Sequence, residues 1–297
     1  MTDATSPPRK PWLVLLWAFG LFVLAYFVLY AYYAVAGAVT GAGFKGIASG
    51  AVETPLTICI RGAIGSVAGI PFLFLIIRLL WRRPLVWLWI DRPNRRLIWH
   101  LGLGFLCAAM VVAVPLLLGY GTITAWPSRY SASTMALLLL GTIGWTCFTA
   151  LLEEVVFRGM VARELAQSWG WPAATVVTGL FFALVHMLGI VAILTPGTAV
   201  LLLIGGSAVN LLFVVLYRRN RSIWSPFGFH AGWNFTLAAI AGTTMSGQSA
   251  DHGLFNIEIH GGLMRTGGEF GVELSLLAVV LYLAVAIAYG WRRGIVR

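Results

Sequence analysis

Two adjacent glutamates follow a long apolar run in this sequence. Glu153 and Glu154 come directly after MALLLLGTIGWTCFTALL, a stretch without a charged residue. A charge at the middle of a bilayer costs about 2.5 to 3.5 kcal/mol on insertion scales, so acids in such a run indicate a functional site. The structural alternative is that the pair ends a membrane span at the cytoplasmic surface, where Glu154 and Arg158 form an i,i+4 ion pair.

Two further apolar segments each carry a histidine. His186 lies in VTGLFFALVHMLG, and His230 lies in SPFGFHAGWNF. Helical spacing places Phe182 on the face of His186 and Asn234 on the face of His230. Side chains of this kind facing lipid separately would leave their hydrogen bonds unmade, so we expect these faces to meet the Glu153 helix in one polar cavity.

The chemistry that such a group suggests is attack by water. One carboxylate, placed beside a like charge in a low dielectric, suits a general base, and the other stays ionised through Arg158 and orients the site. One imidazole positions the water, while Asn234 and the second imidazole donate hydrogen bonds to a developing oxyanion. No nucleophilic side chain lies beside a base in these motifs, which favours water as the nucleophile.

A zinc ion is the rival to a carboxylate acting alone. Glu153, His186 and His230 are acceptable zinc ligands that leave a fourth position open to water. The histidines come from two helices and do not form an HExxH pattern, so their spacing does not establish a metal site. The sequence leaves zinc as an open alternative.

Composition indicates an integral membrane protein. Of the 297 residues, 60% are hydrophobic and only 10% are charged, with a mean hydropathy of +0.89, which excludes an ordinary soluble domain. The net charge of +10 does not indicate nucleic-acid binding, because the basic residues lie between apolar segments and are not interleaved with stacking aromatics. The three cysteines share no CxxC spacing, so neither a disulfide framework nor a thiolate zinc site is expected.

The apolar segments predict an all-α polytopic helix bundle with eight transmembrane spans. The predicted spans are 12–35, 60–81, 99–119, 135–156, 172–194, 196–217, 223–242 and 270–291. Basic residues gather before the first span and in every second connection. These residues are Arg9, Lys10, Arg82, Arg83, Arg92, Arg95, Arg96, Arg158, Arg163, Arg218, Arg219, Arg221, Arg292, Arg293 and Arg297. By the positive-inside rule, both termini are predicted to be cytoplasmic.

The positions of His186, His230 and Asn210 within these spans lead to two further expectations. His230 is about seven residues into its span from the cytoplasmic side, whereas His186 is about fourteen residues into its own, which separates them by roughly 10 Å at 1.5 Å per residue. Their depths can match if the segment from Arg163 to Trp171 projects into the cytoplasm, or if the helices are strongly tilted. Asn210, in the sixth span, is expected to make a hydrogen bond between helices.

The motifs together resemble those of a known family. EEVVFR (Glu153 to Arg158), FALVH (Phe182 to His186) and HAGWN (His230 to Asn234) are similar, in order and in placement on separate helices, to the EExxxR, FxxxH and HxxxN/B motifs of the CPBP family. This family contains the CAAX proteases and the bacteriocin-processing (Abi) proteases. The apolar segments recur along the whole chain and predict a single membrane domain, 1–297, with the first three spans in 1–130. The resemblance covers the C-terminal half, where it implies a protease-like core with spans four to eight in 131–297; the first three spans match the family only in being hydrophobic.

The resemblance also implies a function and roles for the site residues. The implied activity is that of an intramembrane endopeptidase with a polar cavity open toward the cytoplasm. Glu153 would activate water with His186, Glu154 and Arg158 would support that carboxylate, and His230 with Asn234 would stabilise the oxyanion. Family members are described both as metalloproteases and as metal-free glutamate proteases, so the resemblance leaves zinc open as well.

Two other functional classes are compatible with the same cluster. One is a non-catalytic membrane immunity or scaffold protein that binds a partner in the polar cavity. The other is a proton-coupled transporter, but the sequence lacks the repeated halves or paired broken helices that favour one. The expected partners are the lipid bilayer and a membrane-associated protein or peptide; the oligomeric state stays open.

The ratio of arginine to lysine indicates the kind of organism, and with it the expected substrate and membrane. Arginine outnumbers lysine eighteen to two, which is typical of a GC-rich bacterial genome. Prenylated protein tails are not expected in such an organism, which argues against a prenyl substrate. Helical spans in a bacterium indicate the inner membrane.

Overall fold

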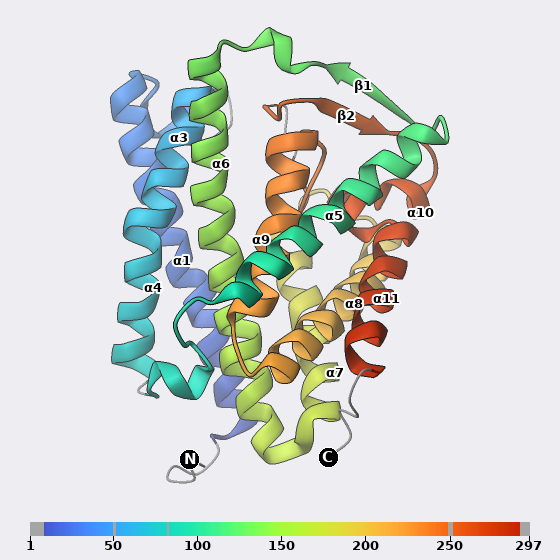
Figure 1. Ribbon diagram of the computed structural model, residues 1–297. Helices are drawn as coiled ribbons and strands as arrows, with labels where there is room; N and C mark the ends of the chain where they lie inside the picture. Colours follow the sequence, from blue (N-terminus) through green and yellow to red (C-terminus); the bar gives the residue numbers. More distant parts are fainter. Residues whose placement is uncertain (1–8, 50–51, 82, 249–251, 292–297) are drawn as a thin grey trace.

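A computed structural model describes residues 9–49, 52–81, 83–248 and 252–291, and Figure 1 shows a bundle made almost wholly of helices. Helices occupy all eight segments that were predicted as spans, so the predicted all-helical bundle is observed. The long helices, with the π-helical stretches (η) that continue some of them, are α1 (Pro11–Thr40), α3 (Pro55–Ala63), η1 (Ile64–Gly69), α4 (Ile70–Ile76), η2 (Ile77–Trp81), α5 (Arg95–Leu117), α6 (Ala132–Glu153), η5 (Glu154–Ala162), α7 (Arg163–Gly189), α8 (Pro196–Asn220), α9 (Trp224–Phe235), η6 (Thr236–Ala241) and α11 (Leu276–Trp291).

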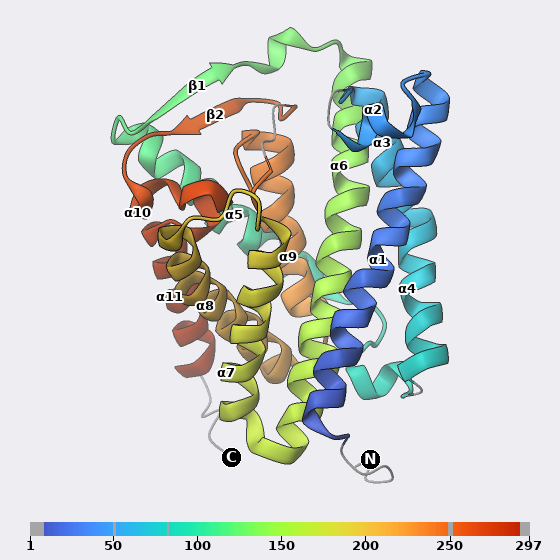
Figure 2. The same cartoon turned by 180° about the vertical axis from the view of Figure 1, so that it is seen from behind.

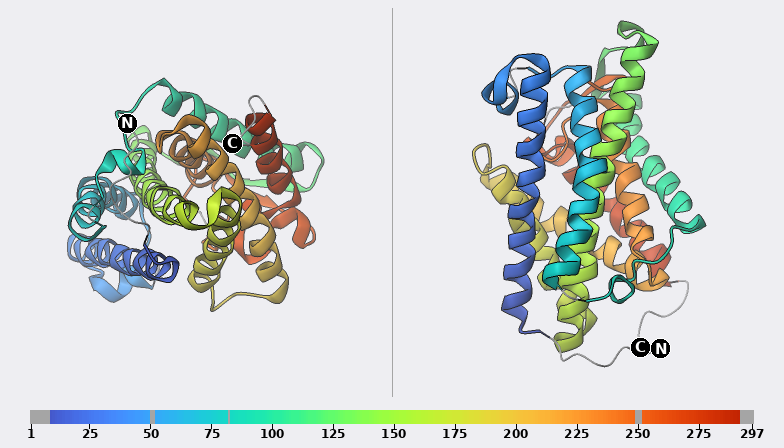
Figure 3. Two further views of the ribbon diagram at one scale, coloured as in Figure 1. Left: turned by 90° about the horizontal axis from the view of Figure 1, so that it is seen from below. Right: turned by 90° about the vertical axis from the view of Figure 1, so that its left-hand side faces the viewer.

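Shorter elements connect these helices. They are α2 (Gly43–Ala48), α10 (Leu263–Thr266), the strands β1 (Gly121–Ala125) and β2 (Asn256–Ile259), and the 3₁₀ turns η3 (Leu85–Leu88), η4 (Pro127–Arg129), η7 (Gly268–Phe270) and η8 (Val272–Leu274). Seen from below in Figure 3, α1, α3 and α4 form a group on one side of α6, and α8 and α11 lie on the other side. The division into 1–130 and 131–297 stays a prediction.

Five helical stretches in the described residues are long and apolar enough to cross a membrane. The fourth of these, Ala132–Gly189, contains the hairpin of α6, η5 and α7, and a shorter apolar helix follows at Leu276–Gly290. The chain is therefore an integral membrane protein of several spans, and the exact number of eight stays a prediction. Of the basic residues used for the topology, Arg82, Arg292, Arg293 and Arg297 lie outside the described residues.

Side chains at the helix starts explain where several spans begin. Thr54 and Thr57 form a reciprocal capping box at the start of α3, and Ser131 and Thr195 accept backbone N–H groups at the starts of α6 and α8. These contacts satisfy N–H groups that the first helical turn leaves without partners. Proline at the first position of α3 and α8 supports the same boundaries.

A break in α7 explains how His186 and His230 reach the same level. Gly170 has φ 74° and ψ 164°, which interrupts the helix just before Pro172. Figures 1 and 2 show that the turn between η5 and α7 extends further toward the end of the bundle where α1 begins than the start of α9 does. The segment up to Trp171 thus projects beyond the start of α9, and its position in the cytoplasm stays a prediction.

Glycines allow the helices around the site to pack backbone against backbone. A Cβ at Gly104 of α5 would lie 2.0 Å from the carbonyl oxygen of Phe229, and one at Gly232 of α9 would lie 2.2 Å from that of Leu101. Without a hydrophobic driving force between helices in lipid, small residues of this kind permit the close packing that holds them together. The contact fixes α9, and thus His230, against α5.

A two-stranded antiparallel sheet lies across the end of the bundle opposite the start of α1 (Figure 1). Gly121 of β1 pairs with Ile259 of β2, and Thr122 pairs with Glu258. The strand β2 lies in the connection between the predicted spans 223–242 and 270–291, where the sequence predicted no strand. His260 binds the Thr122 hydroxyl at 2.8 Å, and His252 lies 4.0 Å from Glu53, so these two histidines connect outer segments of the chain.

The α5–α9 contact can be tested with a pair of alanine variants. Gly104→Ala is expected to destabilise the protein by about 1 to 3 kcal/mol, because the new methyl group forces two helix backbones apart. Gly102→Ala in the same helix is the control, since a Cβ at Gly102 meets nothing within 4 Å. Thermal unfolding of the purified proteins in detergent measures the difference, and equal melting temperatures for the two variants would contradict the packing described.

Candidate active site

The two glutamates stand where α6 passes into a π-helical segment. Glu153 is the last residue of α6, and Glu154 is the first residue of η5. π-helical turns inside longer helices are frequent at functional sites. The side chains of Glu154 and Arg158 are both 0% exposed, so their ion pair is not a surface feature at the end of a span.

The Glu154–Arg158 pair forms as the i,i+4 spacing predicted. Arg158 Nη1 donates to Glu154 Oε1 at 3.0 Å. The guanidinium also lies over the rings of Phe213, at 4.6 Å, and Phe182, at 5.1 Å. Aromatic faces stabilise a desolvated cation, so Arg158 is held by η5, α7 and α8 together.

His230 is anchored by Glu154. Its Nδ1 lies 2.8 Å from Glu154 Oε1, and a carboxylate accepts, so Nδ1–H is the donor. The imidazole also stacks on Phe213, with ring centroids 5.1 Å apart. Glu154 and Arg158 were expected to support the Glu153 carboxylate; their direct contact in the structure is with His230, whose Nε2 is thereby turned toward Glu153.

His186 is anchored by its own helix. Its Nδ1 lies 2.8 Å from the Phe182 carbonyl oxygen, so Nδ1–H donates there and Nε2 is free to face the site. The rings of Phe182 and His186 are 4.1 Å apart, as their predicted common face requires.

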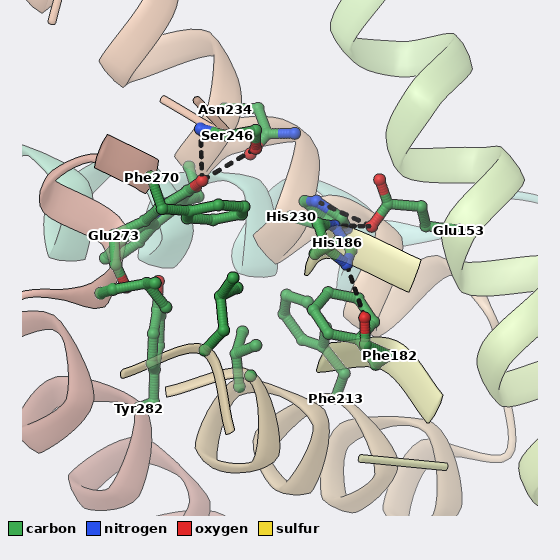
Figure 4. A pocket seen from close by; sticks show the side chains of 15 residues that line it. Glu153, Phe182, His186, Phe213, His230, Asn234, Ser246, Phe270, Glu273 and Tyr282 are labelled. Carbon is green, nitrogen blue, oxygen red and sulfur yellow. Dashed lines mark hydrogen bonds and ion pairs between the residues drawn. The ribbon is translucent and has the colours of Figure 1, made fainter. Parts of the chain in front are cut away.

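Glu153 lies between the two imidazoles. Its Oε2 is 3.8 Å from His186 Nε2 and 3.9 Å from His230 Nε2. Both distances exceed hydrogen-bond length, and one water molecule can bridge groups at this separation. Figure 4 shows Glu153 and the histidines at one side of a cavity of about 50 Å³, which has room for a few water molecules.

Asn234 lines the same cavity from α9, one helical turn beyond His230, and it is 8% exposed. The structure thus brings all six predicted residues to one place: Glu153, Glu154, Arg158, His186, His230 and Asn234. Asn210 does not belong to the cavity, because its Nδ2 donates to the Thr175 carbonyl at 2.9 Å. The expected hydrogen bond between helices is therefore confirmed.

The three candidate zinc ligands do not form a zinc site in this geometry. Two ligands of a tetrahedral zinc ion with bonds near 2.0 Å stand about 3.3 Å apart, whereas Glu153 Oε2 stands 3.8 and 3.9 Å from the two nitrogens. Within the described residues no group of three His, Cys, Asp or Glu side chains is placed to hold a metal ion. The chemistry below is therefore derived from the side chains alone.

Eleven residues that line the cavity were not among the predicted site residues, and five of them follow η6 in the chain. These five are Ser246, Phe270, Glu273, Leu274 and Tyr282. Glu273 is the one with a recognisable sequence signal, because it is an acid directly ahead of an apolar run, but it falls at the edge of the last predicted span, 270–291. Ser246, Phe270 and Glu273 belong to the loops between α9 and α11, at the opposite end of the helices from the arginine-rich connections.

Comparison with known proteins supports the motifs. Residues 134–236 match the family model described as type II CAAX prenyl endopeptidase Rce1-like. The resemblance to the CAAX proteases of the CPBP family is confirmed. The match covers 103 of the 297 residues and includes every predicted site residue. No curated protein and no solved structure matches the chain.

The buried ion pair should contribute strongly to folding. Arg158→Met is expected to destabilise the protein by about 3 to 5 kcal/mol, because it leaves the Glu154 carboxylate buried without a cation. The control is Arg61→Met, since Arg61 pairs with Glu53 at 3.3 Å in a partly exposed position, where such pairs contribute at most about 1 kcal/mol. Thermal unfolding in detergent compares the two, and a smaller loss for Arg158→Met than for Arg61→Met would contradict this assignment.

Proposed function

We propose that the chain is an intramembrane endopeptidase that hydrolyses a peptide bond in a membrane-associated protein or peptide with a water molecule activated by Glu153. The observation that carries the proposal is the position of Glu153 Oε2, which lies 3.8 Å from His186 Nε2 and 3.9 Å from His230 Nε2 beside a cavity of about 50 Å³. The match to the CAAX protease family supports the same reaction class.

The proposed reaction begins with the water between Glu153 and His186. Glu153 accepts a proton as the water oxygen attacks the substrate carbonyl carbon, while His186 Nε2 accepts the second O–H of the water and holds it in line. The new carbon–oxygen bond converts the carbonyl into a tetrahedral oxyanion. When the C–N bond breaks, the proton on Glu153 passes to the leaving amine.

The oxyanion needs donors on the other side of the reacting carbon. Asn234 offers the Nδ2 amide, and His230 offers Nε2–H in its protonated form, which the adjacent Glu154 stabilises. Removing one such donor typically costs a factor of about 10² to 10³ in kcat. Glu154 and Arg158 are positioning residues, because they act on the substrate only through His230.

The position of the enzyme in the membrane is also part of the proposal. We propose eight crossings, with both termini in the cytoplasm of a bacterial cell and the protein in its inner membrane. The described arginine-rich connections support this orientation, as do the start of α1 and the end of α11, which lie at the same end of the bundle (Figure 1). The words 'prenyl endopeptidase' describe the matched family and not this chain. We therefore do not propose a prenylated substrate.

Reporter fusions test the orientation. A green fluorescent protein fused to the C-terminus is expected to fluoresce, and alkaline phosphatase at the same place is expected to be inactive, because that end is cytoplasmic. Alkaline phosphatase inserted after Gly262 should instead be active, since this residue lies in the loop at the opposite end. The reverse pattern would overturn the proposed topology.

Peptide cleavage tests the reaction. Glu153→Gln is expected to lower the cleavage of a quenched fluorescent peptide library by a factor of about 10² to 10⁴, the usual contribution of a general base. The matched control is Glu258→Gln, because Glu258 is an exposed acid on β2, outside the cavity. His186→Ala should also abolish cleavage.

Two further outcomes discriminate among the alternatives. Cleavage should survive a zinc chelator, because the side chains alone supply the chemistry; loss to the chelator would replace the glutamate mechanism with a metal-dependent one. Cleavage that persists in folded Glu153→Gln protein would overturn the assignment of the base. If the biological effect of the protein survives Glu153→Gln, the protein would instead be a non-catalytic immunity or scaffold protein.

A further inference from the structure

The cavity contains a carboxylate that the proposed reaction does not use. Glu273 lies in the turn η8, ahead of α11, and lines the cavity together with Glu153, His186 and Asn234. Figure 4 shows its carboxylate on the opposite side of the cavity from Glu153. Glu273 is only 9% exposed, so its placement needs a physical reason.

One half of the Glu273 carboxylate is firmly held. Its Oε1 accepts hydrogen bonds from the Ser246 backbone N–H at 2.7 Å and from the Ser246 hydroxyl at 2.8 Å. The Tyr282 hydroxyl donates to the Glu273 carbonyl oxygen at 3.2 Å, which fixes the backbone of the same residue. These contacts orient the side chain without neutralising its charge.

The other oxygen, Oε2, accepts no hydrogen bond within the described part of the chain, and none of the ion pairs there includes Glu273. Burial of a carboxylate without a cation is costly, and such groups in cavities are functional candidates. Burial raises the pKa of Glu273, which stands outside the helical spans, to about 7, although the hydrogen bonds from Ser246 and the charge of His230 lower it. A cationic ligand would stabilise its ionised form.

The remaining walls of the cavity select the kind of cation. Leu202, Phe270, Leu274 and Tyr282 line the same cavity as Glu273 and give it apolar surface. A lysine side chain combines an apolar stem with a compact ammonium group, and so matches both the walls and the single carboxylate. Arginine fits less well, because its planar guanidinium binds a carboxylate through both oxygens, and Ser246 already occupies Oε1 of Glu273.

We propose that Glu273 and Ser246 form a specificity subsite that binds a lysine side chain of the substrate close to the bond attacked at Glu153. The description of the ligand as a substrate rests on the proposed function. Glu153 and Glu273 then have separate tasks on opposite sides of one cavity: the first activates water, and the second selects the peptide and orients it.

A binding experiment tests the subsite without requiring turnover. Fluorescein-labelled hexapeptides carry one lysine, moved stepwise along an alanine–leucine sequence, and a matched set carries norleucine at the same positions. Fluorescence anisotropy measures their affinity for the full-length Glu153→Gln protein in detergent. At one position, lysine is expected to bind about tenfold or more tighter than norleucine, as a hydrogen bond to a charged group allows.

The preference should disappear when Glu273→Gln is added to the Glu153→Gln protein, while the norleucine peptides bind with unchanged affinity. Glutamine still accepts the Ser246 hydrogen bonds, and unchanged norleucine binding shows that the cavity is intact. Glu258→Gln in the same background is the charge control and should retain the lysine preference. Ser246→Ala is a second variant, expected to weaken the preference without abolishing it.

The proposal is overturned if lysine is preferred at no position, or if the preference survives Glu273→Gln. It is also overturned if that substitution weakens lysine and norleucine peptides equally, because Glu273 would then serve only the structure of the loop. A different experimental result would show that the proposed function is wrong. A wild-type protein that binds lysine peptides through Glu273 but cleaves none of them retains the subsite and is not an endopeptidase.

Discussion

The buried ion pair of Glu154 and Arg158 is the constraint on which the site depends. Two charges with 0% exposed side chains are tolerated only because each is met by partners fixed in place. Arg158 meets the rings of Phe182 and Phe213, and Glu154 meets the imidazole of His230. A single pair therefore connects η5 to α7, α8 and α9. The position of His230 relative to Glu153 follows from that connection, because the same imidazole bonds Glu154 through Nδ1 and faces Glu153 through Nε2.

Much of the fold could be predicted from local sequence, because apolar run length and capping residues act within one segment. The start of α8 at Pro196 coincides with the predicted boundary. Contacts between distant segments have no comparable signal in the sequence. Gly104 is an unremarkable glycine in the sequence and becomes a packing residue only where Phe229 approaches it. The pairing of Gly121 with Ile259 joins segments far apart in the chain, and neither segment shows a strong strand pattern.

The candidate site shows the same division between local and distant effects. The Glu154–Arg158 pair and the stacking of Phe182 on His186 follow from positions four residues apart on a helix. The choice of His230 as the partner of Glu154 could not be predicted, because it depends on the relative heights of α7 and α9. The backbone break at Gly170 contributes to those heights. Glu273 was missed for a related reason: the last span was predicted from residue 270, whereas α11 begins at Leu276 and leaves Glu273 in a turn that folds back into the cavity.

The two sides of the cavity come from different parts of the chain. The family match, residues 134–236, contains Glu153, His186 and Asn234, whereas Ser246 and Glu273 lie beyond it. Chemistry that hydrolyses a peptide bond requires a fixed arrangement of base, water and oxyanion donors, so the residues that perform it tolerate little variation. Recognition of the neighbouring side chain is a separate requirement, and a loop on the opposite wall can meet it without disturbing the helices that hold the base. The proposed division of tasks lets substrate preference change through the segment that carries Glu273 while the Glu153 side of the cavity keeps its geometry.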